Sequence, residues 1–267
     1  MNRSDVEFAA EKMSRLKADF QVEVLSDWGE EADSWQDGSW TLEELDRLHT
    51  VLCCLSDSIG GPNKVREGTG GVTVRKADMG SHGGEALKHR VSFSTKHTFS
   101  AWTVIHEFAH AWDANYKWRL SRRLEKYTGG FTNPILSFGM RLARLSDSGL
   151  FDYEQKPGRQ GRRPGCNRAG YFYGDKPSGS NWNFNRIEDF AESVAMYVGW
   201  ERGNDLSDWA KARLDRYLLE DGAQHQFFGI DNWKYYSRYF YPENGDYTKT
   251  KRWQFMDDLV NDRIELL

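Results

Sequence analysis

The sequence predicts an α+β fold that is mainly helical and contains a small mixed sheet. Several long segments place apolar residues three and four positions apart, which is the spacing of a buried helix face. Two short segments, 72–74 and 89–94, are typical of strands and come directly before one of these helices. The 267 residues are 39% hydrophobic and 28% charged, so the chain can bury a substantial core.

The N-terminal elements follow from local signals. Residues 4–18 begin with serine and carry glutamate three positions later, a capping-box pattern, and then continue as an amphipathic helix. Residues 20–24 alternate apolar and polar side chains and predict a strand. A second capping pattern at Thr41 opens a helix with a leucine stripe, and the Gly-Gly-Pro run 60–62 ends it. We expect the stripe to be core, because it lacks sustained heptads.

The segment 100–113 carries His106-Glu107-x-x-His110 within an apolar helical pattern. Residues four apart lie on one face of a helix, so both imidazoles can point at the same metal ion. Glu107 is rotated by about 100° and can reach a water in an open coordination position. The alternative is an ordinary packed helix with two core histidines, and a third ligand would decide between these interpretations.

A second segment with an apolar helical face, residues 183–200, carries Glu188 and Glu192 four residues apart. One interpretation is capping, because Asn185 with Glu188 fits a capping box and acids favour a helix N-terminus. The other is that Glu188 is the third zinc ligand. Glu192, one turn on, would then accept a proton from the far nitrogen of a ligating histidine.

These two segments resemble the gluzincin clan of zinc metallopeptidases, in which HExxH is joined by a glutamate on a later helix and an acid four residues after it. The motif sequences His-Glu-Phe-Ala-His and Glu-Asp-Phe-Ala-Glu are similar to those of the anthrax lethal factor-like branch. The two helices are a small part of the chain. The resemblance implies a zincin-like catalytic domain that binds one zinc through His106, His110 and Glu188, with Glu107 as base and proton shuttle.

The sequence also departs from the clan. The chain between His110 and Glu188 is longer than in compact members, and Asn181 stands where the lethal factor-like branch keeps a tyrosine. No motif therefore identifies the oxyanion stabiliser. The candidates, by residue type only, are Tyr171, Tyr173, Tyr197, Tyr235 and His225. Asp113, on the same helix as the histidines, is expected either to hydrogen-bond a ligand or to pair with an arginine.

Domain organisation is predicted as a catalytic domain over residues 1–203 and a helical, aromatic-rich lobe over 204–267 packed on it. The first contains a basic, Gly/Pro-rich insertion at 117–180. The basic charge is either a solvated face or a rim that attracts an acidic segment of a peptide or protein substrate. The aromatic cluster 233–241 supports an alternative function, an inactive zincin-fold module that binds a glycan or protein partner.

Charge and hydropathy restrict the possible binding partners and the cellular location. The net charge of −4 gives no reason to expect nucleic acid or an anionic membrane, and no apolar run reaches membrane-spanning length. The first 25 residues lack the hydrophobic core of a signal peptide, and the three cysteines are an odd number. We therefore expect cytoplasmic synthesis in a reducing compartment, although unconventional export would leave the same sequence. The expected function is zinc-dependent hydrolysis of peptide bonds.

Overall fold

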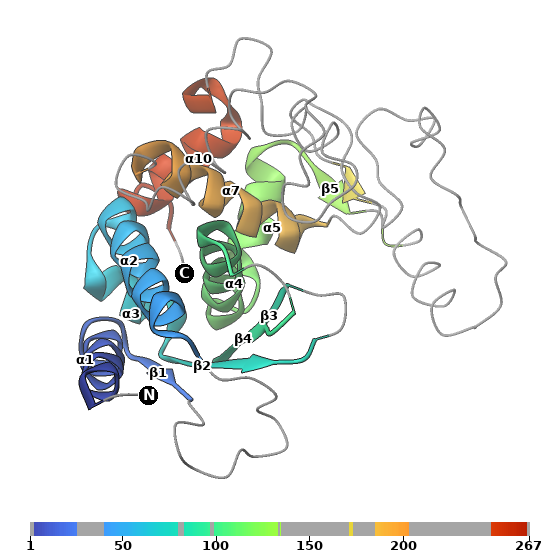
Figure 1. The fold of residues 1–267 in the computed structure, drawn as a ribbon. Coiled ribbons are helices and arrows are strands. Elements are labelled where there is room, and N and C mark those ends of the chain that lie inside the picture. The colour runs from blue at the N-terminus through green and yellow to red at the C-terminus, as the bar shows by residue number, and fades with distance from the viewer. Residues whose placement is uncertain are drawn as a thin grey trace, which may run out of the picture.

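The computed structural model describes residues 3–25, 40–79, 83–96, 99–132, 134, 171–172, 185–202 and 247–265. The described chain is mainly helical and carries a small mixed sheet, which confirms the predicted α+β class (Figure 1). Among these described ranges, no helix is long and apolar enough to cross a membrane.

The sheet has four strands, β1 (Val22–Val24), β2 (Val72–Ala77), β3 (Gly84–Leu87) and β4 (Arg90–Ser94), in the order β1-β2-β4-β3. The first three strands of that order are parallel, and β3 runs antiparallel to β4. Strand β3 is therefore an edge of this sheet. A separate two-stranded ribbon pairs β5 (Phe131–Thr132) with β6 (Tyr171–Phe172).

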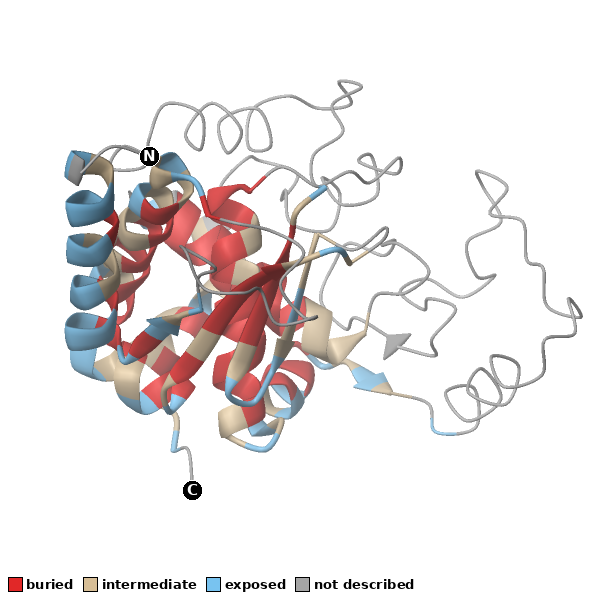
Figure 2. Cartoon of the chain, turned by 60° about the horizontal axis from the view of Figure 1, so that its bottom comes forward, coloured by how far each residue is buried: buried red, intermediate tan, exposed pale blue. Residues whose placement is uncertain are grey.

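Helix α4 (Ala101–Asn115) is the central element of the fold. It lies between the sheet and α7 (Arg186–Arg202) and also packs against α2 (Leu42–Ile59), α3 (Pro62–Thr69) and β3 (Figure 1). The remaining elements are α1 (Arg3–Phe20), α5 (Arg119–Tyr127), α10 (Lys251–Val260) and the short 3-10 helix η2 (Tyr247–Lys249). Helix α10 packs on α7 and α5. Buried residues gather in the middle of the molecule (Figure 2), and many of them belong to α4 and α7.

Several sequence predictions for the N-terminal half are confirmed. Thr41 forms a complete capping box with Glu44, in which each side chain accepts a hydrogen bond from the other residue's backbone N–H. Gly60 ends α2 in the left-handed conformation, at φ 100°. Cys53 and Cys54 lie next to each other on α2, and Cys54 is buried.

The predicted strand at 20–24 was wrong in its first two residues, because β1 begins at Val22. Phe20 is the last residue of α1, and the backbone changes direction at Gln21, where φ is 56°. Helix α1 also begins at Arg3, so Ser4 lies inside it rather than before it. Helix α3 was not predicted, although Pro62 at its first turn is a favourable helix start.

The structure leaves the domain boundary untested. The proposed start of the C-terminal lobe and the aromatic cluster 233–241 lie outside the described residues, as does most of the basic insertion. The described start of that insertion contains α5, which was also not predicted.

Candidate metal centre

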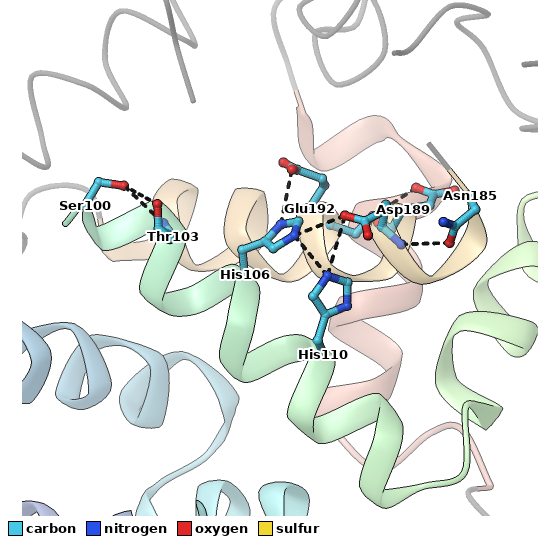
Figure 3. Close-up of polar contacts among 9 residues, drawn as sticks. Ser100, Thr103, His106, His110, Asn185, Asp189 and Glu192 are labelled. Atoms are coloured by element: carbon cyan, nitrogen blue, oxygen red, sulfur yellow. Dashed lines mark hydrogen bonds and ion pairs between the residues drawn. The ribbon is translucent and has the colours of Figure 1, made fainter. Parts of the chain in front are cut away.

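Helix α4 brings the two histidines of the motif together at the face that contacts α7. The helix starts where the Ser100 side chain accepts a hydrogen bond from the Thr103 backbone N–H, at 3.1 Å (Figure 3). One turn apart, the rings of His106 and His110 meet edge to face, with 4.6 Å between centroids. Their Nε2 atoms are 3.0 Å apart. Both rings therefore present Nε2 to a common point.

Glu188 reaches this point from the first turn of α7. Asn185 begins that helix, because its side-chain oxygen accepts hydrogen bonds from the backbone N–H groups of Ile187 at 2.8 Å and Glu188 at 3.3 Å. The Glu188 Oε2 atom lies 3.2 Å from the Nε2 of His106 and 3.5 Å from the Nε2 of His110. Asn185 thus caps the helix while the Glu188 carboxylate points to the histidines.

The three candidate ligand atoms form a triangle slightly smaller than the one that a tetrahedral zinc requires. Bonds of about 2.0–2.2 Å place the ligand atoms of a tetrahedral zinc about 3.3–3.6 Å apart. The observed separations are 3.0, 3.2 and 3.5 Å. Two imidazoles and one carboxylate are also a donor set of catalytic zinc sites, which keep a fourth position open. Within the described part of the chain, this is the group whose metal-binding atoms converge.

Glu192 lies behind His106, on the side away from the convergence point. Its Oε1 is 3.2 Å from the His106 Nδ1 (Figure 3). This distance is that of an ion pair. A carboxylate in this place favours a proton on Nδ1, which leaves the Nε2 lone pair free for a metal.

The charges of the cluster shift one another's pKa. Burial alone would lower the pKa of His106, but the carboxylates of Glu192 and Glu188 raise it well above its ordinary value. Burial opposes ionisation of Glu188, but His110 and His106 hold its pKa well below the usual range. In the metal-free protein the cluster therefore favours an ionised Glu188 beside a protonated His106.

The Glu107 side chain lies on a different side of α4, beneath the edge strand β3. It is 6% exposed, and its Oε2 has no hydrogen-bond partner among the described residues. Burial raises the pKa of Glu107, and the neighbouring histidines partly offset this effect. Glu107 is thus a buried carboxyl whose affinity for a proton is increased.

Asp113 has a role that the sequence did not suggest. Its Oδ1 accepts hydrogen bonds from the backbone N–H groups of Leu120 at 3.0 Å and Ser121 at 3.1 Å, so it holds the first turn of α5. Its Oδ2 accepts no hydrogen bond from a described residue. Neither expected interaction, with a ligand histidine or with an arginine, is formed in the described structure.

A buried ion pair fixes α7 beside the candidate metal centre. Asp189 is fully buried and accepts two hydrogen bonds from Arg252 of α10. The Nε atom donates to Oδ1 at 2.8 Å, and the Nη2 atom donates to Oδ2 at 3.1 Å. This pair could not be predicted from the sequence, because its partners are far apart in the chain and neither belongs to a motif.

The structure describes the side chain of one oxyanion candidate, Tyr197. This residue packs against Trp253 of α10 with 4.5 Å between ring centroids, and burial raises its pKa to about 12. It follows Glu188 by nine residues, which turns it to the opposite side of α7. This position does not support the predicted role. Tyr173, Tyr235 and His225 lie outside the described residues, and only the backbone of Tyr171, in β6, is described.

Comparison of the chain with protein-family models, with curated proteins and with solved structures found no match.

Proposed function

We propose that this chain is a zinc-dependent endopeptidase with a zincin-like catalytic domain of the gluzincin type. One observation carries the proposal. The Nε2 atoms of His106 and His110 converge with the Oε2 of Glu188 from a separate helix, and Glu107 follows the first ligand directly in the chain. An ordinary helix pair has no need to collect these donors at one point.

His106, His110 and Glu188 would hold the zinc ion. When bound, zinc supplies a Lewis acid for a substrate carbonyl and lowers the pKa of a coordinated water. Glu192 orients the His106 ring through its Nδ1 and increases the basicity of its Nε2. Asn185 and the Asp189–Arg252 pair fix the first turn of α7, and with it Glu188.

Glu107 is the proposed general base. As a water molecule attacks the scissile carbonyl, the Glu107 carboxylate accepts a proton from that water. The resulting carboxylic acid then donates the proton to the leaving amine. A carboxyl group serves both steps best when its pKa lies close to the working pH. The upward shift that burial gives the pKa of Glu107 acts in this direction.

The edge strand β3 supports a peptide as substrate. Strand β3 pairs with β4 on one side and is the edge of the four described strands, and it lies against α4 next to Glu107. An extended peptide can add to such an edge through backbone hydrogen bonds. The basic residues Arg119, Arg122 and Lys126 of α5 are exposed, and an acidic substrate segment remains our expectation.

The test compares the wild type with Glu107→Gln. Metal is identified and quantified by mass spectrometry, and cleavage of a mixed peptide library is followed in the same samples. We expect one zinc per chain in both proteins and a loss of turnover of about 10²- to 10⁴-fold in the variant. A chelator should abolish wild-type cleavage and added zinc should restore it. Equal cleavage by both proteins would remove Glu107 as base, and bound zinc without any cleavage would favour the inactive binding module.

A further inference from the structure

Gly84, the first residue of β3, contacts the Glu107 side chain so closely that it leaves no room for a side chain of its own. A Cβ atom at this position would lie 2.6 Å from both the Cγ and the Oε1 of Glu107, and 2.8 Å from its Cδ. Side-chain carbons do not approach other heavy atoms this closely. Any residue other than glycine would therefore displace Glu107 or the strand.

The backbone does not explain this glycine. Among the described glycines, five have positive φ, and Gly84 is not one of them. Alanine would fit its backbone conformation without strain. The adjacent Gly83 is different, because a Cβ there would meet only the Cγ2 of Thr103, at 4.0 Å. The close contact is therefore specific to Gly84 and to Glu107.

Packing, rather than hydrogen bonding, holds one side of the Glu107 carboxyl group. The side chain is buried, and its Oε2 has no hydrogen-bond partner among the described residues. Gly84 is itself fixed, because its position in β3 pairs with Phe93 of the buried strand β4. The strand backbone at Gly84, held by its pairing with β4, thus packs against the Cγ, Cδ and Oε1 atoms of Glu107.

We propose that Gly84 is a positioning residue, which sets the place of the Glu107 carboxylate by packing its backbone against that side chain. The catalytic part of this inference rests on the proposed function. A methyl group at position 84 would push the carboxylate away or lift β3 from α4. A displacement of about 1 Å from the productive geometry can lower turnover by about 100-fold.

The first test is a double-mutant cycle on the thermal unfolding of the full chain, with Gly84→Ala and Glu107→Ala. In the wild-type background we expect Gly84→Ala to lower the unfolding midpoint by about 5 °C, as overpacking does. Glu107→Ala removes the three atoms that the methyl group would meet, so in that background Gly84→Ala should cause no loss. Gly83→Ala, the matched control, should change little in either background. An equal loss in both backgrounds would overturn the proposal.

The second test measures turnover and metal content of Gly84→Ala. We expect kcat to fall by about 10- to 100-fold with unchanged metal content, whereas Gly83→Ala keeps the wild-type kcat. An unchanged kcat in Gly84→Ala would overturn the proposed role in positioning. If the wild type cleaves no peptide but the cycle shows the coupling, the contact between Gly84 and Glu107 stands and the proposed peptidase function fails.

Discussion

Two neighbouring acids on α7, Glu188 and Asp189, meet very different surroundings. The helix turns them about 100° apart. Asp189 is fully buried and both of its carboxylate oxygens accept hydrogen bonds from the guanidinium of Arg252. The Glu188 side chain is 37% exposed, and its Oε2 lies 3.2 and 3.5 Å from the Nε2 atoms of two histidines. The first site is complete within the protein, whereas the second gathers donors that a cation would use.

Unpaired polar atoms make the same distinction. On the histidine side, the Nδ1 of His110 and one oxygen each of Glu107 and Glu192 are buried without a hydrogen-bond partner among the described residues. Each such atom costs about 1–3 kcal/mol. A fold retains groups of this kind where they serve a function more often than where they only support packing. The comparison separates a structural ion pair from a candidate metal centre on one helix.

Breaking the structural pair should have the largest effect on folding. Arg252→Met leaves the Asp189 charge buried without its partner, and we expect the free energy of unfolding of the metal-free protein to fall by about 3–5 kcal/mol. Denaturant titration measures this change. The control is Arg263→Met, because Arg263 is half-exposed and pairs with Asp257 and Asp258 at the surface. Its loss should destabilise the protein much less, because exposed ion pairs contribute little to stability. Similar losses in the two variants would mean that burial of the Asp189 pair has no special importance.

Removing Glu188 should have the opposite effect, a large loss of zinc affinity with little loss of stability. We expect Glu188→Ala to lower zinc affinity by more than 100-fold, because loss of a residue behind a ligand already costs about 10- to 100-fold. The metal-free protein should lose much less stability than Arg252→Met does. Competition with a chromophoric chelator measures the affinity. Glu201→Ala, an exposed acid in the last turn of the same helix, removes the same charge and should leave zinc affinity unchanged. Unchanged affinity in Glu188→Ala would exclude it as a ligand.

Replacing Glu192, which lies behind His106, should have an intermediate effect on zinc affinity and should change how that affinity depends on pH. We expect Glu192→Gln to lower zinc affinity by about 10- to 100-fold. In the metal-free wild type, Glu192 helps to raise the pKa of His106, so zinc must displace a proton and apparent affinity increases with pH up to that raised value. Without the Glu192 charge the pKa falls, and the affinity should level off at a lower pH. Calorimetry in buffers of different ionisation enthalpy measures the released proton. The same proton release in both proteins would contradict this account.

The sequence predicted the elements whose signals are local. The helix carrying His106 and His110 has continuous apolar periodicity and a serine cap, and α2 has both halves of its capping box. The direction of Glu188 could be inferred only because the upstream motif required a third ligand. Its own surroundings in the sequence fit a capping box with Asn185 equally well. The structure confirms Asn185 as the cap, while the Glu188 carboxylate points to the histidines.

The missed elements depend on contacts between distant residues. Strand β3 has the sequence Gly-Glu-Ala-Leu, which has low strand propensity, and it exists through its pairing with β4. Helix α5 has few apolar residues and begins where Asp113 of the previous helix accepts its first backbone N–H groups. The contact of Gly84 with Glu107 and the pairing of Asp189 with Arg252 likewise join residues that no sequence spacing relates.

The smallest expected effect on zinc affinity comes from removing the Asn185 cap of α7. Asn185→Ala leaves the N–H groups of Ile187 and Glu188 without their acceptor, which should lower the free energy of unfolding by about 1 kcal/mol. Because Glu188 lies in this first turn, fraying should also weaken zinc binding by about fivefold, the equivalent of the same free energy. Thr41→Ala removes the comparable cap of α2 and should lower stability by a similar amount without changing zinc affinity. Equal loss of affinity in both variants would mean that caps act on the metal only through global stability. A loss confined to Asn185→Ala would mean that the local order of this turn sets the position of Glu188.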